Sequence, residues 1–212
     1  EAFYDDMLRH DVRPLTLGGD HTLSLPILRA MAKKHGPLAL LHIDAHADIN
    51  SHMFGEEIAH GTPFRRAFEE GLLDADHVFQ IGLRGTGYTA EDFDWASERG
   101  FQVVQAEQLW HQSAAPLMDQ IRQQIGARPV YLSFDIDSLD PAYAPGTGTP
   151  EIGGLTSIQA LEIIRGCRGL SLVGADLVEV SPPYDTNGNT ALLAANLLFE
   201  MLCVLPGVAY RD

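Results

Sequence analysis

The chain has 212 residues, of which 45% are hydrophobic, and these values are typical of one domain with a sizeable core. Its formal net charge of −15, and the lack of an apolar run long enough to cross a bilayer, argue against nucleic acid and membranes as partners. The two cysteines, Cys167 and Cys203, form no CxxC pair, which argues against a disulfide framework or thiolate metal site and favours a cytoplasmic location.

Apolar runs and amphipathic segments alternate along the chain. Residues 1–9 have the pattern of the end of a helix and do not begin with Met, so we expect that an N-terminal part, with any organellar targeting segment, is missing. The predicted strands are 14–17, 38–43, 78–81, 101–104, 130–134 and 172–180. The predicted helices are 26–36, 62–71, 90–98, 114–125, 157–165 and 190–205. This alternation predicts an α/β fold, a parallel sheet with helices on both faces, in a single domain over residues 1–212.

Three potential metal ligands follow the strand at 38–43. Asp44, His46 and Asp48 alternate with two alanines. In an extended chain these positions share one face, so two carboxylates and an imidazole can converge on one point. Acidic residues at a strand end are also common in plain polar turns, so this pattern alone does not decide between a turn and a site.

Further candidate ligands follow two other predicted strands. Asp135 and Asp137 come after the strand at 130–134, and His21 ends a Gly-Gly-Asp-His turn. Ligands collect at the carboxyl ends of parallel strands, and adjacent carboxylates repel one another unless a cation lies between them. The conjunction of the three segments predicts a metal centre with six ligands: His21, Asp44, His46, Asp48, Asp135 and Asp137.

This ligand set indicates the chemistry. Six ligands suit two ions if two carboxylates bridge them, and such a pair activates water as a nucleophile. Asp and His without Cys favour Mn²⁺, Mg²⁺ or Fe²⁺ over Zn²⁺. No Lys or Arg lies in either ligand block, which argues against a phosphoester substrate. Glu179, near the end of the last predicted strand, could instead pair with a guanidinium, although an exposed acid at a strand end has the same pattern.

Two long irregular loops, 49–61 and 140–154, follow the ligand blocks. Long loops in compact domains are commonly functional, so we predict that these two form walls of the site. Residues 84–87, Arg-Gly-Thr-Gly, have the composition of a phosphate-binding loop but no Lys, and we predict a turn there.

Four segments together resemble the ureohydrolase (arginase/agmatinase) superfamily: Gly-Gly-Asp-His at 18–21, Asp-Ala-His-Ala-Asp at 44–48, Ser-Phe-Asp-Ile-Asp-Ser-Leu-Asp-Pro at 133–141, and the segment around Glu179. Within that superfamily the chain looks most like the agmatinases and guanidino-acid hydrolases, the guanidinobutyrase-like branch. The resemblance runs over about residues 15–208. It implies a three-layer α/β/α, arginase-like fold, two Mn²⁺ ions per chain, and a homo-oligomer, either a trimer or a hexamer.

The resemblance also implies a role for each matching residue. One ion would be held by His21, Asp44, Asp48 and Asp135, and the other by His46, Asp44, Asp135 and Asp137, so that Asp44 and Asp135 bridge the two. Glu179 would bind the guanidinium. His60 falls where the family has a proton-shuttling His, although a His before Gly is commonly a turn residue. We expect His42, in phase with Asp44, to be a packed strand residue.

The implied reaction is hydrolysis of a guanidino compound to an amine and urea. A hydroxide held by the metals would attack the guanidinium carbon, Asp137 would relay a proton to the leaving amine, and His60 would exchange protons with solvent. A metal-dependent amide deacetylase, which typically needs one metal and fewer carboxylates, is a second class. An inactive, metal-stabilised subunit is a third.

The loop before His60 bears on the substrate. The Ser-Gly-Asn stretch of arginases is absent and residues 51–57 replace it, which argues against arginine. We expect 4-guanidinobutanoate as the substrate, with its far end near three loop residues, Asn50, His52 and Met53. Agmatine, whose ammonium could pair with Glu56 or Glu57, is the alternative.

Overall fold

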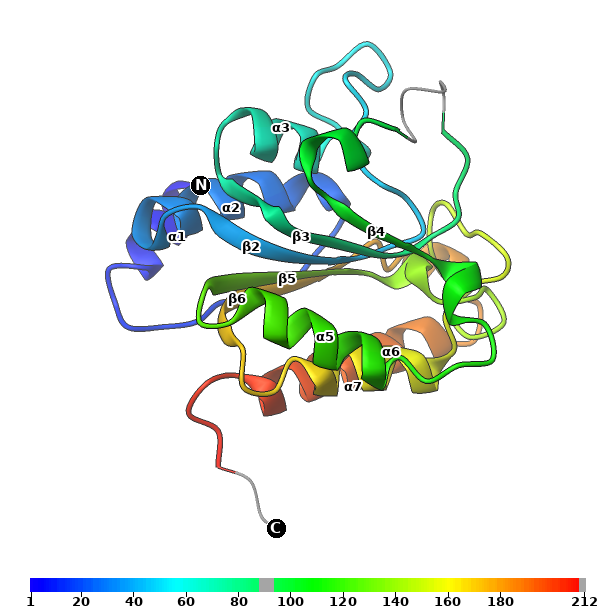
Figure 1. Cartoon of the computed structure of the whole chain (residues 1–212). Helices are drawn as coiled ribbons and strands as arrows, with labels where there is room; N and C mark the ends of the chain where they lie inside the picture. The colour runs from blue at the N-terminus through cyan, green and yellow to red at the C-terminus, as the bar shows by residue number, and fades with distance from the viewer. Residues whose placement is uncertain (88–93, 210–212) are drawn as a thin grey trace.

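Six strands form one sheet in the computed structural model, which describes residues 1–87 and 94–209 (Figure 1). They are β1 (Leu15–Leu17), β2 (Leu38–Ile43), β3 (Leu73–Leu83), β4 (Gln102–Gln105), β5 (Pro129–Asp135) and β6 (Ser171–Val178). Their order across the sheet is β1-β6-β5-β2-β3-β4, and each neighbouring pair is parallel. Strand β2 is buried along its whole length, as its nearly continuous apolar sequence predicts for a central parallel strand.

Helices cover both faces of this sheet (Figure 1). One face carries α1 (Ala2–Met7), α2 (Ser24–His35) and α3 (Pro63–Glu69), and the other carries α5 (Ala115–Ile125), α6 (Ser157–Gly166) and α7 (Asn189–Val204). Each face has its own hydrophobic core: Leu28 and Phe64 belong to the first, and Ile121 and Leu197 to the second. The described residues therefore have the expected three-layer α/β/α architecture.

Short 3₁₀ helices follow several strands and direct the chain at the edge of the sheet. They are η1 (His21–Leu23), η2 (Ser97–Arg99), η3 (Ala106–Leu109), η4 (Ile136–Ser138) and η5 (Pro182–Tyr184). Asp20 caps η1 by accepting a hydrogen bond from the Thr22 backbone N–H, at 2.9 Å. Asp135 caps η4 in the same way, accepting from the Asp137 N–H at 2.8 Å. These caps fix the direction in which the chain leaves β1 and β5.

Three predicted elements differ from the structure. Strand β3 begins at Leu73, five residues before the predicted start at Val78; its pairing register with β2 shifts in this part, where polar side chains obscure the strand pattern. Strand β6 ends at Val178, not at residue 180, because Glu179 has a left-handed backbone with φ of 64°. Residues 90–93 of the predicted helix 90–98 lie outside the described residues, and its described part ends in the 3₁₀ helix η2.

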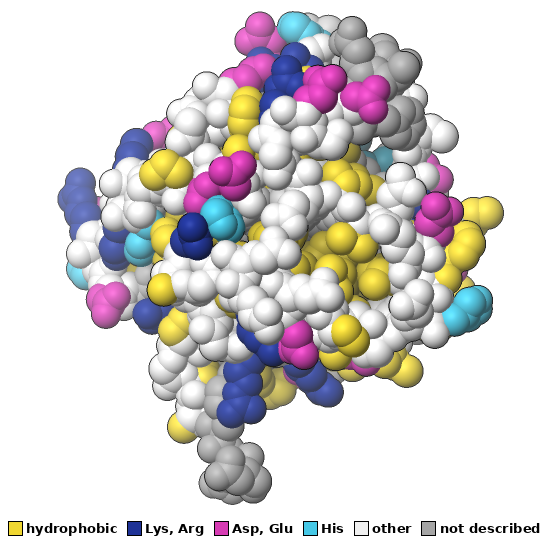
Figure 2. All heavy atoms as spheres, in the orientation of Figure 1, with side chains coloured by type: hydrophobic (Ala, Val, Ile, Leu, Met, Phe, Trp, Pro, Cys, Tyr) yellow, Lys and Arg dark blue, Asp and Glu magenta, His cyan; other side chains and the backbone are white. Residues whose placement is uncertain are grey.

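On the face drawn in Figure 2, Lys and Arg side chains stand in small separate groups among acidic ones. Within residues 1–87 and 94–209, no helix is both long and apolar enough to span a bilayer.

Candidate metal centre

The candidate ligands and Glu179 lie where four adjacent strands end. His21 follows β1, Glu179 follows β6, Asp135 ends β5 and Asp44 follows β2, and these strands are neighbours in that order. Their carboxyl ends share one edge of the sheet, at the right in Figure 1. Ligand sites in parallel α/β sheets lie at this edge. The fold thereby joins distant parts of the chain: the backbone N–H of His21 donates to Oε1 of Glu179 at 2.7 Å.

His21 is surrounded by three carboxylates. Its Nδ1 lies 2.8 Å from Oδ2 of Asp48, 3.2 Å from Oδ2 of Asp44 and 3.3 Å from Oδ2 of Asp135. The imidazole is fully buried, yet within the described residues Nδ1 forms no hydrogen bond of acceptable geometry. A buried nitrogen that faces three oxygens without a directed hydrogen bond has the geometry expected of ligands arranged around a cation.

A second group forms around His46. Its Nδ1 lies 3.1 Å from Oδ2 of Asp137 and 3.6 Å from Oδ1 of Asp44. Asp44 thus turns one oxygen toward His21 and the other toward His46, as a bridging carboxylate must. The described contacts of the Asp135 carboxylate are with His21 and with the Asp137 backbone, so its bridging role stays a prediction.

Burial and mutual repulsion disturb the titration of these groups. Burial, followed by the charges of Asp137 and Asp44, raises the pKa of Asp135 well above its ordinary value. Burial alone would lower the pKa of His46, but contacts with Asp137 and Asp44 raise it to about 12. The pKa of His21 is likewise raised, by Asp135, Asp44 and Asp48 against burial. Four carboxylates and two imidazoles without sulfur fit a pair of hard or borderline divalent cations, which would replace these protons.

Two site residues have strained backbones. Asp48 has a φ of 53° and Glu179 a φ of 64°, a left-handed conformation that non-glycine residues seldom adopt. Such a conformation costs about 1–3 kcal/mol and is found preferentially at functional sites. Surrounding contacts hold both residues: the Asp48 carbonyl accepts from the Phe64 N–H at 3.2 Å, and the Glu179 N–H donates to the Gly19 carbonyl at 2.9 Å.

His42 belongs to this centre, contrary to our expectation of a plain packed residue. Its Nε2 lies 2.7 Å from Oδ2 of Asp44, and its Nδ1 lies 3.0 Å from Nε2 of Gln80. His42 also falls within the group of ligand atoms formed by His21, Asp44 and Asp48. The even spacing between His42 and Asp44 was the available signal. His42 therefore orients Asp44 or adds a nitrogen to the centre.

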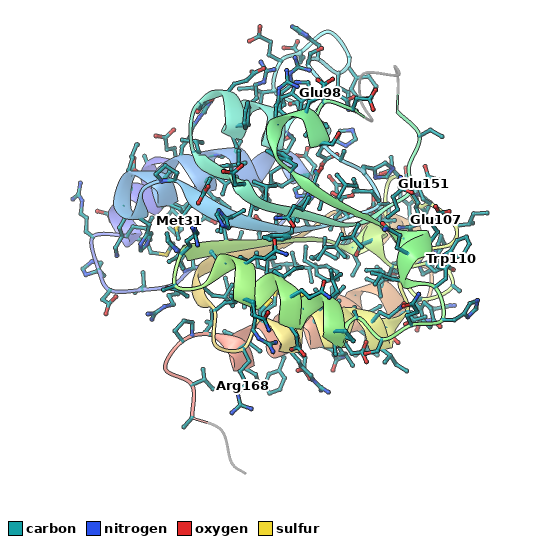
Figure 3. The ribbon with its side chains drawn as sticks, in the orientation of Figure 1. Met31, Glu98, Glu107, Trp110, Glu151 and Arg168 are labelled. Atoms are coloured by element: carbon teal, nitrogen blue, oxygen red, sulfur yellow. The ribbon has the colours of Figure 1, made fainter. Side chains whose placement is uncertain are left out.

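A cavity of about 690 Å³ opens beside the two groups. Both long loops contribute to its wall, as predicted, through residues such as Met53 and Thr149. Glu179 also lines it; burial raises the pKa of this carboxyl, against the hydrogen bond from the His21 N–H. Figure 3 shows Glu107, Trp110 and Glu151 gathered at the same end of the molecule, and all three line the cavity.

The predicted loop residues take different positions. His60 lines the cavity, and its ring lies 6.1 Å from that of Phe54 in a stacked arrangement. Asn50 and Met53 also line the cavity, although Nδ2 of Asn50 already donates to the Gly61 carbonyl at 3.1 Å. His52 is not brought into the described lining; its exposed ring lies 3.7 Å from a Glu57 oxygen.

Sequence reasoning missed three further residues at the cavity. The Arg84 guanidinium donates to backbone carbonyls of η4 and of the loop 140–154, including those of Asp137 at 2.8 Å and Glu151 at 2.7 Å. Arg84 therefore joins this loop to the 3₁₀ helix that follows β5. Thr149 donates to Oδ2 of Asp137 at 3.1 Å, and the Glu151 carboxylate lies 3.7 Å from Nε2 of His46. No local pattern marks these residues, because their partners are distant in sequence.

The fold and this centre define a parallel α/β protein with a carboxylate–histidine metal site at the ends of its strands. The model of the arginase family matches residues 1–203, and the chain belongs to that family. Together with the two ligand groups, family membership indicates a binuclear metal site.

Three known proteins show the range of similarity. A guanidinobutyrase from Pseudomonas aeruginosa is 71% identical over 211 residues, which cover 100% of this chain and 66% of the relative. A mitochondrial agmatinase from Gallus gallus is 62% identical over 205 residues, 97% of this chain and 60% of the relative. The structure of proclavaminate amidino hydrolase from Streptomyces clavuligerus has a TM-score of 0.88 at 43% identity, covering 94% of this chain and 68% of that one. The chain thus spans about two thirds of the length of these relatives.

Proposed function

We propose that the protein is a manganese-dependent hydrolase that converts a guanidino compound and water into an amine and urea, with 4-guanidinobutanoate as its substrate. The observation that carries the proposal is the pair of ligand groups joined by Asp44, which lies beside a cavity lined by Glu179. The 71% identity to a guanidinobutyrase and the family membership support it. Family membership also favours this reaction over an amide deacetylase.

The six predicted ligands would hold the two ions. The His21 group would take one and the His46 group the other, with Asp44 shared. Oxygen and imidazole ligands without thiolates support manganese. When bound, the ion pair would lower the pKa of a water molecule and so supply a nucleophile at neutral pH.

Glu179 would bind and orient the substrate. Its Oε1 accepts the His21 N–H at 2.7 Å, which fixes the carboxylate and leaves Oε2 available to pair with the guanidinium. Partial burial strengthens that pair, because water competes less for both partners. Glu179 would thereby turn the guanidinium carbon toward the ligand groups.

Two further groups would move protons. Asp137, whose Oδ2 is near both His46 and Thr149, would pass a proton to the nitrogen of the leaving amine when the C–N bond breaks. His60 lies on the cavity wall, and an imidazole can both accept and donate a proton, so His60 would exchange protons between the cavity and solvent.

The far end of the substrate would decide specificity. Asn50 and Met53 line the cavity and would face the carboxylate and methylene groups of 4-guanidinobutanoate. One specific observation favours agmatine as a second candidate: Glu107 and Glu151 also line the cavity and could pair with its terminal ammonium. The similarity to an agmatinase supports that alternative as well.

Side-by-side urea release from 4-guanidinobutanoate, agmatine and arginine tests the proposal. We expect the catalytic efficiency to fall in that order, because an unpaired polar group buried at the far end costs enough to separate analogues. If agmatine gives the highest catalytic efficiency, the proposed substrate is wrong. If arginine does, the assignment to the branch of agmatinases and guanidino-acid hydrolases is wrong as well. No urea from any of the three would favour the inactive subunit.

We extend the proposal to assembly and location. The exposed apolar residues Leu192 and Phe199 of α7, 65% and 63% exposed, support a homo-oligomer, which light scattering would identify as a trimer or hexamer. The bacterial relative supports a cytoplasmic location, and the name of the Gallus gallus relative supports a mitochondrial one.

A further inference from the structure

A row of polar side chains crosses the sheet just behind the candidate metal centre. Asp176 of β6 is paired in register with Ser133 of β5, Ser133 with His42 of β2, and His42 with Gln80 of β3. All four residues are fully buried, where unpaired polar groups would be costly. Asp176 is an acid in this row for which the proposed reaction has no use.

The hydrogen bonds of Asp176 have a definite direction. Its carboxylate accepts from the hydroxyl groups of Ser24 at 2.8 Å, Tyr131 at 2.8 Å and Ser133 at 2.7 Å. A serine hydroxyl has a single proton, and Ser133 donates its proton in the hydrogen bond to Asp176. Ser133 Oγ also lies 2.8 Å from Nε2 of His21. It must therefore accept from that nitrogen, which makes Nε2 the protonated nitrogen of the ring.

We propose that Asp176, acting through Ser133, is a positioning residue that fixes His21 as a metal ligand through Nδ1. Asp176 orients the serine hydroxyl, the hydroxyl holds the proton on Nε2, and Nδ1 is thereby directed at the oxygens of Asp44, Asp48 and Asp135. A carboxylate behind a ligating histidine sets the ring's orientation and makes the other nitrogen more basic. This inference rests on the proposed metal site.

Two serines that donate to the Asp176 carboxylate provide a matched pair of variants. Ser133→Ala removes a hydrogen bond to Asp176 and also the contact with His21. Ser24→Ala removes a hydrogen bond of similar length to the same carboxylate and leaves Ser133 in place. A purely structural role of the network would make the two variants similar, whereas a positioning role separates them.

The metal-free protein is titrated with Mn²⁺, and the EPR signal of the free ion reports how much has bound. This experiment measures the affinity for each ion without any activity assay. For Ser133→Ala we expect one of the two ions to bind about 10- to 100-fold more weakly and the other to be unchanged. For Ser24→Ala both affinities should stay within about threefold of the parent, which is less than the loss expected when a hydrogen bond that orients a ligand is removed. Ser133→Thr, which keeps the hydroxyl, should restore the lost affinity.

Equal affinities in Ser133→Ala and the parent, or equal losses in the two alanine variants, would overturn the inference. If Ser133→Ala does not fold, Ser133→Cys replaces it, because a thiol of similar size is a weak hydrogen-bonding group. Failure of the parent protein itself to bind Mn²⁺ would overturn the proposed function, which is a distinguishable result.

Discussion

Replacing Glu179 by glutamine removes one charge from the cavity with little change of shape. In the structure, Oε1 of Glu179 accepts the backbone N–H of His21 at 2.7 Å. The amide oxygen of glutamine can accept the same bond, so the backbone of the candidate ligand His21 should stay in place. The amide nitrogen would then occupy the position of Oε2, where it presents a donor to a guanidinium that has only donors.

The expected loss follows from the charged hydrogen bond. Hydrogen bonds to charged groups contribute about 1.5–3 kcal/mol. Since about 1.4 kcal/mol corresponds to tenfold in rate, kcat/KM for urea release should fall about 10- to 150-fold. The loss should be similar for 4-guanidinobutanoate and agmatine, because both have the same guanidinium end.

Urea release over a range of substrate concentrations, with metal content measured on the same samples, tests this prediction. With 4-guanidinobutanoate as the substrate, Glu107→Gln is a suitable control, because it removes a carboxylate from the same cavity and leaves the hydrogen bond between His21 and Glu179 in place. An unchanged kcat/KM for Glu179→Gln would show that this acid does not hold the guanidinium. A loss of bound metal in that variant would show instead that it supports the ligands.

Three further predictions concern proton transfer, stability and metal binding. His60→Ala should keep its metal and lose about 10²-fold in turnover, with partial rescue by added imidazole; unfolding or metal loss would refute the shuttle role. Phe54→Asn should raise the melting temperature by about 2–4 °C, which corresponds to about 1 kcal/mol of stability. Phe54 and Gly55 have φ of 54° and 84° in a two-residue turn, and such turns favour Asn-Gly. An unchanged or lower melting temperature would count against strain at Phe54. Mn²⁺ binding at pH 7 should release at least one proton, since the pKa of His46 in the metal-free centre is about 12 and Nδ1 must lose its proton to bind. The affinity for Mn²⁺ should therefore rise with pH. Calorimetry in buffers with different heats of ionisation measures the number of protons released, and a value of zero would contradict this prediction.

The proximity of the candidate ligands could be predicted because their information is local. Asp44, His46 and Asp48 alternate within five residues at the end of an apolar strand, and Asp135 and Asp137 repeat that pattern. The rule for parallel sheets suffices to place such side chains at one edge. The alternation of an extended strand does not explain their convergence, because β2 ends at Ile43 and Asp137 lies in the 3₁₀ helix η4. The register of the sheet then brings them together, as predicted.

Residues behind the ligands could not be predicted in the same way. Ser133 meets Asp176 only because β5 and β6 pair in one particular register. Arg84 joins the loop 140–154 to η4 through backbone carbonyls, and contacts with the backbone cannot be recognised from side-chain patterns. The early start of β3 at Leu73 was hidden because a shift in strand register interrupts the alternation. Contacts that depend on how the strands pair are seen only in the structure.

The number of manganese ions per chain, measured together with urea release as Mn²⁺ is added to metal-free protein, tests the central claim most directly. The two ligand groups joined by Asp44 predict two ions per chain, with urea release that depends on the second ion. Saturation at a single ion, with full urea release and with Asp48 or Asp137 free of metal contact, would contradict the binuclear centre on which the account depends.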